Sequence, residues 1–364
     1  MQLSTTLSWL VDAAGEMPSA DRLLAELGAH LIADGLPLAG GALTLAVPHP
    51  LIARRTFLWR ADSAEVIEAL GFAPATSPTL PEATGSIHDG RRWLAGIAAG
   101  PVHEDTIGPR PDGPSLAFVA PRAFTSDETD QLRQAARFAA APLAALAARA
   151  TLSAALEAYL GRRSAARVLA APLRRGAGET IQAALLYADL RGFTVLSESH
   201  PPALVIAALD AWFDRIAGAV HAFGGEVLKF IGDGILAIFP VVGEGRRSAC
   251  EAALRAITAA RAGMARLNSE RQAQGLPPLP FGAALHLGEM LWGNIGAADR
   301  LDFTAIGPAV NLVSRLEGLC RPLEKTVLVS GTFAAQTQAP LIPLGTHVLR
   351  GIASPCAVFT LPET

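Results

Sequence analysis

The sequence contains few of the residues that mark an extracellular or nucleic-acid-binding protein. Its three cysteines, Cys250, Cys320 and Cys356, lie far apart and show no paired metal-ligand spacing. This argues against a disulfide framework or a zinc site and predicts small buried thiols in a reducing compartment. The formal net charge of −3 argues against a general nucleic-acid binder, which would be basic over a whole domain.

Long apolar runs are also scarce. The N-terminus, "MQLSTTLSWLVDAAGE", has neither a basic start nor an apolar stretch of signal-peptide length. The most apolar tract, "FAAAPLAALAARATLSAALEAYL", consists largely of alanine and carries Arg149 and Glu157, so we expect no membrane span. The expected location is the cytoplasm.

Aromatic residues make up only 6% of the chain, whereas hydrophobic residues make up 51%, much of it alanine. Alanine favours helices over cores built from large aromatic side chains. At roughly 100–200 residues per domain, 364 residues suggest two or three domains. We predict an α+β protein in three parts: a sensor-like domain over 1–122, a helical linker and dimerisation segment over 123–177, and a second α+β domain over 178–364.

The first part combines helical and strand patterns. Helical spacing in "SADRLLAELGAHLIADG" precedes strand-like "GALTLAVPHP" and "RRTFLWRAD", a turn-rich "GFAPATSPTLPEATG", and then "RRWLAGIA" and "PSLAFVAPRAF", which we also interpret as strands. This order, with a closing helix, is typical of an α+β sensory fold. His49, His88 and His103 are scattered along it, and we interpret them as structural or surface residues.

A long helix is predicted to follow. Thr125 and Glu128 fit a capping box that opens a helix running to about Leu160, with a kink at Pro142 and an end at Gly161. Near its end three leucines share one face, which indicates either core packing or a parallel dimer seam: Leu152, Leu156 and Leu160.

The next stretch, "GRRSAARVLAAPLRRG", holds five arginines and no acid. Such a run usually forms a solvated face; a regulatory or phosphate-contacting role is the alternative.

From residue 179 strands and helices alternate. "ETIQAALLYADL" predicts a strand, "PPALVIAALDAWFDRIAGAVHAFG" an amphipathic helix, and "EVLKFIGDGILAIF" a hairpin. A helix near 245–274 precedes "FGAALHLGEMLWGNIG", which we interpret as a strand pair, then a helix in "PAVNLVSRLEGLC" and a strand in "TVLVSGTF". The order predicts a βαββαβ arrangement, an antiparallel-leaning sheet with helices on one face.

Two carboxylates mark the candidate site. Asp189 ends the first of these strands and Asp233 lies at the hairpin tip, so pairing of the strands would bring them together. Two carboxylates without a nearby counter-charge should bind a hard divalent cation, and Mg²⁺ prefers carboxylates together with phosphate oxygens. The pair therefore indicates a nucleotide polyphosphate. The loop after Asp189, which contains Gly192, can offer backbone N–H groups to a phosphate.

Three stretches, "YADLRGFT", "GGEVLKFIGDGILAIF" and "FTAIGPAVNLVSRLE", occur in the order found in class III adenylate and guanylate cyclases. Residues of about 178 to 362 resemble the catalytic domain of that family. The resemblance implies a ferredoxin-like catalytic domain, two Mg²⁺ or Mn²⁺ ions per site, and a homodimer with two shared active sites. The first part is similar to GAF-type sensors, whose ligands vary, so an unidentified small molecule or protein is the expected regulator.

The resemblance also assigns roles to residues. Asp189, Asp233 and the backbone carbonyl of Leu190 match the metal ligands. Gly192, Phe193 and Thr194 match the turn that holds phosphate, and Lys229 and Thr304 match the residues that contact the base. Asn311 and Arg315 match the pair that orients the ribose and stabilises the transition state. Arg350 is a candidate for a second phosphate contact. Pro308 stands where relatives often carry aspartate or asparagine, and we expect it to start the helix that bears Asn311.

The predicted reaction converts ATP into 3′,5′-cyclic AMP and pyrophosphate. A lysine only donates hydrogen bonds, so Lys229 suits adenine N1. A threonine at position 304 is similar to the class IIIb subgroup of this family. In the homodimer that the resemblance implies, Lys229 of one chain would serve one shared site, while Asp233 of the same chain serves the other.

Other functions stay open at this point. A catalytically silent nucleotide-binding relay and a guanylate cyclase are the main alternatives. "VLKF" after Glu226 argues against a diguanylate cyclase, and the absence of a basic groove signature argues against a polymerase.

Overall fold

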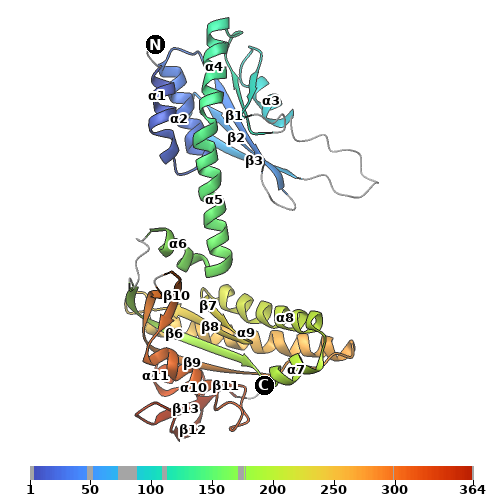
Figure 1. The fold of residues 1–364 in the computed structure, drawn as a ribbon, viewed down its shortest axis with the longest axis vertical. Helices are drawn as coiled ribbons and strands as arrows, with labels where there is room; N and C mark the ends of the chain where they lie inside the picture. The colour runs from blue at the N-terminus through green and yellow to red at the C-terminus, as the bar shows by residue number, and fades with distance from the viewer. Residues whose placement is uncertain are drawn as a thin grey trace. The chain divides into compact units, whose positions relative to one another are not determined.

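The computed structural model describes residues 4–46, 52–72, 88–108, 113–170, 176, 178–297 and 299–362. The chain forms two compact units, Met1–Leu152 and Ser153–Thr364, called here the N-terminal and C-terminal units (Figure 1). Each unit has its own hydrophobic core. The predicted linker, 123–177, is divided between them.

The N-terminal unit is an antiparallel sheet with helices on both faces. The strands follow the order β3-β2-β1-β5-β4. Their bounds are β1 (Gly40–Ala46), β2 (Ile52–Arg60), β3 (Val66–Phe72), β4 (His103–Thr106) and β5 (Ser115–Val119). Helices α1 (Thr5–Asp12) and α2 (Ala20–Ala33), separated by the short η1 (Ala14–Glu16), bury leucines against one face together with α4 (Ser126–Phe138). This agrees with the predicted α+β class.

One predicted strand of this unit is wrong. "RRWLAGIA" lies largely in helix α3 (His88–Ala95), because Leu94 is fully buried and Trp93 and Ile97 pack beside it at helical spacing. Of the histidines, His88 begins α3 and His103 lies in β4, where its Nε2 is 2.6 Å from Oδ2 of Asp105. His49 and most of the turn-rich stretch lie outside the described residues.

The long helix is confirmed, with an interruption. The capping box at Thr125 and Glu128 opens α4. A single residue, Ala139, separates the end of α4 from the start of α5 (Ala140–Leu160). The break at Ala139 lies near Pro142, which has no N–H to donate to the preceding turn. Gly161, with a φ of +81°, lies directly after the helix, as predicted.

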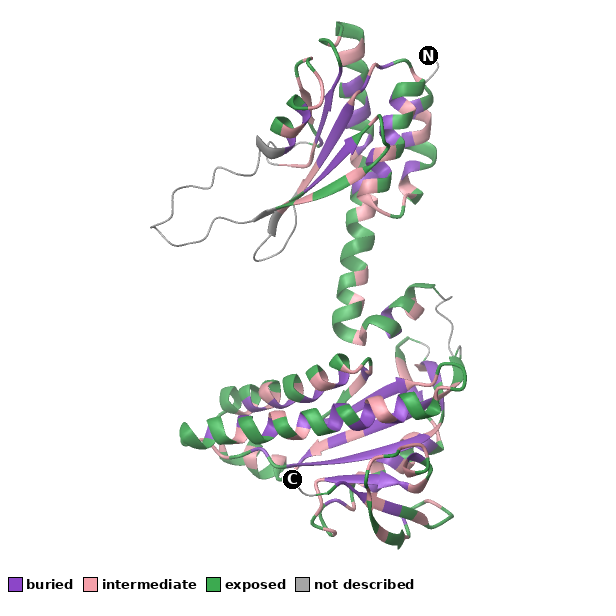
Figure 2. Cartoon of the chain, turned by 180° about the vertical axis from the view of Figure 1, so that it is seen from behind, coloured by how far each residue is buried: buried purple, intermediate pink, exposed green. Residues whose placement is uncertain are grey.

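None of the three leucines on the predicted face of α5 belongs to a hydrophobic core of the described residues, although Leu156 and Leu160 are half-buried. Leu152 is 53% exposed, and most residues after Leu143 are exposed along the helix (Figure 2). The dimer seam therefore stays a prediction. Residues 126–160 are the one described helical stretch long and apolar enough to cross a membrane by length and composition. Within it, Leu143 packs in the core of the N-terminal unit and Arg149 donates a hydrogen bond to the Met17 carbonyl.

The C-terminal unit begins within α5, continues with α6 (Arg162–Ala170) and contains the predicted βαββαβ core. That core consists of β6 (Gly178–Leu190), α8 (Pro202–Ala222), β7 (Glu226–Ile231), β8 (Gly234–Pro240), α9 (Arg246–Ala273) and β9 (Phe281–Gly296). Its strands lie in the order β9-β6-β8-β7, with every neighbouring pair antiparallel, which is the ferredoxin-like arrangement.

Further elements extend this core. The short α7 (Phe193–Ser199) follows β6, β10 (Leu301–Ile306) pairs with β9, and the remaining strands enlarge the sheet beyond β9. These later elements are α10 (Pro308–Glu317), β11 (Val327–Ser330), α11 (Gly331–Ala334), β12 (Ile342–His347) and β13 (Cys356–Thr360).

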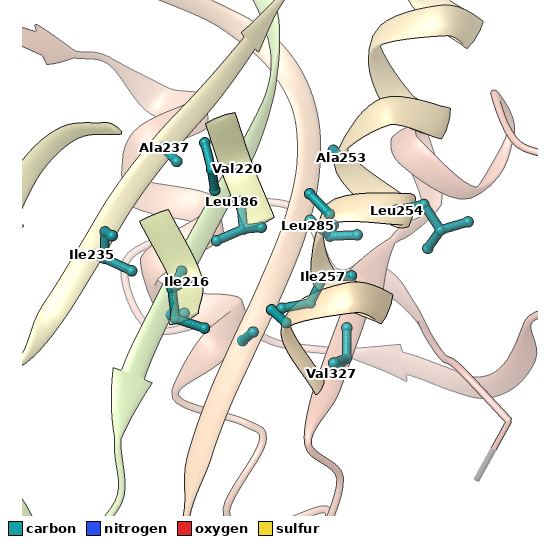
Figure 3. Packing of buried hydrophobic residues seen from close by; sticks show 14 of the residues in the cluster. Leu186, Ile216, Val220, Ile235, Ala237, Ala253, Leu254, Ile257, Leu285 and Val327 are labelled. Carbon is teal, nitrogen blue, oxygen red and sulfur yellow. The ribbon is translucent and has the colours of Figure 1, made fainter. Parts of the chain in front are cut away.

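Helices cover both faces of this sheet, not one face as predicted. Alternate residues of β6 point to opposite sides. Leu186 contributes to the core beneath α8 and α9, whereas Leu185 belongs to the core that contains Val313 and Leu316 of α10. Figure 3 shows the first of these cores, with side chains from both helices and four strands: Leu186, Ile216, Val220, Ile235, Ala237, Ala253, Leu254, Ile257, Leu285 and Val327.

The predicted strand pair in "FGAALHLGEMLWGNIG" is one 16-residue strand, β9. It pairs with β6 from Gly178↔Gly293 to Leu190↔Phe281. Gly288 within this strand allows a close approach of α10: a Cβ there would lie 2.6 Å from the Cβ of Ala309.

The thiols follow the prediction in part. Cys250 and Cys320 are fully buried, whereas Cys356 is only half-buried.

Candidate active site

Strand pairing brings Asp189 and Asp233 together. The β6–β8 register runs to Ala188↔Ile235, so the following residue of β6, Asp189, lies beside the turn that precedes β8. Asp233 occupies that turn, a two-residue hairpin closed by Ile231↔Gly234. Gly232 has a φ of +63°, a conformation that glycine adopts without the steric cost of a side chain. The sequence prediction that these strand ends converge is confirmed.

The pair of carboxylates carries unbalanced negative charge. Burial and then the neighbouring Asp233 carboxylate raise the pKa of Asp189 to about 7. Burial, followed by the charges of Asp189, Glu317 and Asp233, raises the pKa of Tyr187 to about 12. The Oδ1 atom of Asp189 is buried and has no hydrogen-bond partner among the described residues. A buried carboxylate oxygen without a donor is an environment that a cation would stabilise.

These residues fit a divalent metal ion. Asp189 and Asp233 supply hard oxygen ligands, and the Leu190 carbonyl follows Asp189 directly in the chain. Within the described part of the chain, no group of three or more His, Cys, Asp or Glu residues is placed to hold a metal. The protein therefore offers few ligands of its own, so phosphate oxygens and water would complete the coordination, as is usual for Mg²⁺.

Two further charged residues approach the pair, and sequence reasoning missed them. Glu317, at the end of α10, has its pKa raised by burial and by Asp233, while Arg191 acts in the opposite direction. Its Oε1 lies 2.2 Å from the position that a Cβ of Gly282 would occupy, and Gly282 is the cross-strand partner of Asp189. Both charged residues lie inside the motifs quoted above, but only tertiary packing places them beside the aspartates.

The turn after Asp189 has the geometry of a tight loop. Gly192 is left-handed, with a φ of +75°, and α7 begins at Phe193. Gly192 and Thr194 are exposed and Phe193 is half-buried. Their contact with phosphate stays a prediction.

Lys229 pairs with an acid that the sequence analysis did not identify. Its Nζ forms an ion pair with Oδ2 of Asp302. Asp302 lies two residues before Thr304 on β10, so both side chains point to the same side of the strand. That period-two spacing in "LDFT" is the signal that could have found it. Lys229, Thr304 and Asp302 thus form one corner of the unit.

Asn311 and Arg315 project from α10 as predicted. Pro308 occupies the first turn of the helix, and Val313 packs against the sheet on the opposite side. Asn311 and Arg315 are both exposed, and no hydrogen bond or ion pair to another described residue engages either side chain.

Arg350 is an exposed turn residue between β12 and β13. Among the described residues, no hydrogen bond or ion pair joins Lys229, Thr304, Asn311 or Arg315 to the two aspartates.

Comparison with known proteins identifies the C-terminal unit. Residues 177–340 match the family described as Adenylate and Guanylate cyclase catalytic domain. Adenylate cyclase 1 of Rhizobium meliloti is 34% identical over 168 residues, covering 46% of this chain and 25% of that protein. Adenylate cyclase of Anabaena cylindrica is 31% identical over 169 residues, covering 45% of this chain and 32% of that protein.

A solved structure shows the fold. The structure of a bacterial light-regulated adenylyl cyclase is 22% identical, with a TM-score of 0.53, and the alignment covers 71% of this chain and 85% of that chain. The chain spans a third or less of the length of the two curated relatives. Residues 177–340 are thus a nucleotidyl cyclase catalytic domain, preceded by an antiparallel-sheet unit and a long helix.

Proposed function

We propose that this protein is an adenylate cyclase that converts ATP into 3′,5′-cyclic AMP and pyrophosphate at two shared sites of a homodimer, under control of its N-terminal unit. The observation that carries the proposal is the pair of carboxylates at two strand ends, one of which has a buried oxygen without a donor. The adenylate cyclases among the similar proteins support the choice of reaction.

Asp189, Asp233 and the Leu190 carbonyl would hold two Mg²⁺ or Mn²⁺ ions. When bound, such ions lower the pKa of the ribose 3′-hydroxyl and offset charge on the α-phosphate and the departing pyrophosphate. The backbone N–H groups of the turn at Gly192, Phe193 and Thr194 would bind phosphate oxygens.

The exposed pair on α10 would act on the reacting atoms. Arg315 presents a planar set of donors that can bind two phosphate oxygens at once, which stabilises charge as it develops. Asn311, one helical turn earlier, would orient the ribose. Because both side chains lack partners among the described residues, no internal contact has to break before they bind nucleotide.

Lys229 would select the base. The ammonium has three donors and no acceptor, so one N–H can remain on Asp302 while another binds adenine N1. Thr304, on the same side of β10 as Asp302, would accept from adenine N6. Guanine presents an N1–H donor at the position of the adenine N1 acceptor, so Lys229 favours ATP.

A second copy of the chain would complete each site. Among the residues that the structure describes, no hydrogen bond or ion pair links the base-reading corner (Lys229, Thr304 and Asp302) or the α10 pair to the aspartates. In a head-to-tail pair with a two-fold axis, the carboxylates of one chain would face the corner and α10 of the other, which gives two equivalent sites.

The direct test is incubation of the full-length protein with ATP or GTP in Mn²⁺ or Mg²⁺, followed by chromatographic identification of the product. We expect cyclic AMP and pyrophosphate in equal amounts. Cyclic GMP as the main product would overturn the base assignment. Tight nucleotide binding without any cyclic product would instead support the silent relay.

A further inference from the structure

Helix α6 follows α5 in the chain (Figure 1) and is fixed to the catalytic domain at its first turn. Glu226, the first residue of β7, is only 5% exposed. Its Oε1 accepts hydrogen bonds from the backbone N–H groups of Arg163 and Ser164, at 3.1 and 3.2 Å, and Ser164 Oγ lies 3.4 Å away. The carboxylate therefore satisfies donors that have no partner inside the helix.

The corner between α5 and α6 is shaped around this carboxylate. The N-terminus of a helix carries partial positive charge, which favours a buried anion there. Gly161 forms the corner with its positive φ, and a Cβ at this position would lie 2.9 Å from Oε1 of Glu226. A side chain at 161 would thus both strain the backbone and displace the cap. The first turn of α6, which follows α5 across this corner, is therefore held on β7.

The other end of α6 is held against β9. The Arg167 guanidinium lies 4.4 Å from the centroid of the Trp292 ring and also pairs with Glu179 of β6. Trp292 is 2% exposed and meets the Phe303 ring edge-on at 5.6 Å. An arginine over a buried indole contributes a cation–π contact in addition to its packing area.

The contact of Glu226 reaches the strand that carries Lys229, and the contact of Arg167 reaches β9, the strand that pairs with the strand of Thr304. Glu226 lies three residues before Lys229 on β7, and the β7–β8 register shifts between Val227 and Lys229. Such a bulge re-aims the side chains beside it. Trp292 lies opposite Ala305 in the β9–β10 pair, directly next to Thr304. Helix α6 thus contacts Glu226, at the start of the strand that carries Lys229, and Trp292, which pairs with the neighbour of Thr304.

We propose that α6 positions the base-reading corner, so that the helix that follows α5 across the corner at Gly161 controls how strongly and how selectively the catalytic domain binds the purine. This inference rests on the proposed function. Glu226 is buried against α6 and Arg167 lies over Trp292, so both act as positioning residues through the strands that they contact. A displacement of α5 would therefore alter purine affinity and selectivity more than the chemistry at Asp189 and Asp233.

The test compares full-length variants in Mn²⁺ with ATP and with GTP. In Glu226→Ala and Arg167→Ala we expect the KM for ATP to rise about five- to tenfold, which is the value of one lost hydrogen bond or cation–π contact, and kcat to change less. The ratio of ATP to GTP specificity constants should fall by a similar factor. Glu226→Gln keeps an acceptor oxygen and should retain most of the wild-type ratio.

Arg162→Ala is the matched control on the same helix, because the Arg162 side chain is exposed and forms no hydrogen bond or ion pair with any described residue. Circular dichroism establishes that each variant is folded; if Glu226→Ala is not, Arg167→Ala decides alone. Folded variants that lose thermal stability but keep the wild-type KM and ATP-to-GTP ratio would overturn the inference.

The same proteins separate this inference from the proposed function. If the wild type makes no cyclic nucleotide, the proposed function fails. The inference is then judged by competition of ATP and GTP for a fluorescent ATP analogue bound with Mn²⁺. A preference for ATP that weakens in the two variants supports it, and an unchanged preference contradicts it.

Discussion

Asp189 is held in a state that is unfavourable for folding and useful for metal binding. Burial and the Asp233 carboxylate raise its pKa to about 7, far above its ordinary value. A carboxyl whose folded pKa is raised contributes fully to stability below its unfolded pKa of 3.8, and that contribution is lost as pH rises through about 7. Residues that serve function often lower stability in this way.

This predicts opposite effects of Asp189→Asn on activity and stability. Cyclase activity should fall at least about 100-fold, because the proposed metal ligand is replaced by a neutral amide. Without divalent ions at pH 8, the unfolding temperature should be equal to or higher than that of the wild type, since the unfavourable buried charge is gone. Differential scanning calorimetry at pH 5 and pH 8 measures this, with the exposed Asp210→Asn as control. A variant less stable than the wild type at pH 8 would show that the charge is not unfavourable.

Among the elements, β9 shows why a local pattern does not separate one strand from a strand pair. The stretch was predicted as two strands, but the strand is continuous, and Gly288 lets α10 approach closely enough to bury Ala309. A glycine within a strand pattern is compatible with a turn or with a close approach of another element, so local pattern alone does not distinguish them. The same contact fixes α10, and therefore the direction in which Asn311 and Arg315 project.

Gly288→Ala should consequently damage both packing and catalysis. The added Cβ would lie 2.6 Å from the Cβ of Ala309, so α10 must shift, at a cost of about 1–3 kcal/mol in unfolding free energy. We expect kcat to fall with it. Gly218→Ala in α8 is the matched control: nothing lies within 4 Å of its Cβ position, so it should stabilise by about 0.5–1 kcal/mol. Denaturant unfolding with parallel assays measures both; equal effects of the two substitutions would contradict the packing argument.

His286 makes the join between β9 and β11 sensitive to acid. Its Nδ1 lies 2.9 Å from Ser330 Oγ, and burial lowers its pKa to about 4. A histidine whose folded pKa lies below its unfolded value of 6.5 stabilises the fold above pH 6.5, and this stability is lost as pH falls from 6.5 towards 4. The loss amounts to about 3 kcal/mol.

Chemical unfolding of the wild type between pH 7.5 and pH 4.5 should show this decline in stability. In His286→Gln, which cannot gain a proton, the decline over the same range should be smaller by most of that amount, although the variant starts from a lower value. If the free energy of unfolding falls equally with pH in the wild type and in His286→Gln, His286 is not the titrating group.

For the whole molecule, the central question is whether one chain holds a complete site. Asp189→Ala and Arg315→Ala proteins should each be inactive, and mixing equal amounts after co-refolding or co-expression should restore about a quarter of wild-type activity, since half of the dimers then have one intact site of two. Asp189→Ala mixed with Asp233→Ala is the control. Both substitutions remove the same half of the site, so that mixture should stay inactive. If the first mixture stays inactive although heterodimers are demonstrated, the sites are not shared between two chains.

The sequence by itself determined the local features of this protein. Helix and strand periodicity, the capping box at Thr125, the ferredoxin-like order and the meeting of Asp189 with Asp233 follow from patterns that span a few residues or one strand pairing. The predicted roles of the motifs came from their order in the chain. These features could be predicted because neighbouring residues and short connections constrain the backbone directly.

Only the tertiary structure decided which distant residues share a surface. The Lys229–Asp302 ion pair joins positions 73 apart, and the cap of α6 by Glu226 joins positions 63 apart. The placement of α10 on the second face of the sheet depends likewise on Gly288 and Ala309, which come from different elements. Such contacts depend on strand register and side-chain packing throughout the C-terminal unit. A local pattern such as "LDFT" can place Asp302 on the same side of its strand as Thr304, but it does not encode the pairing with Lys229.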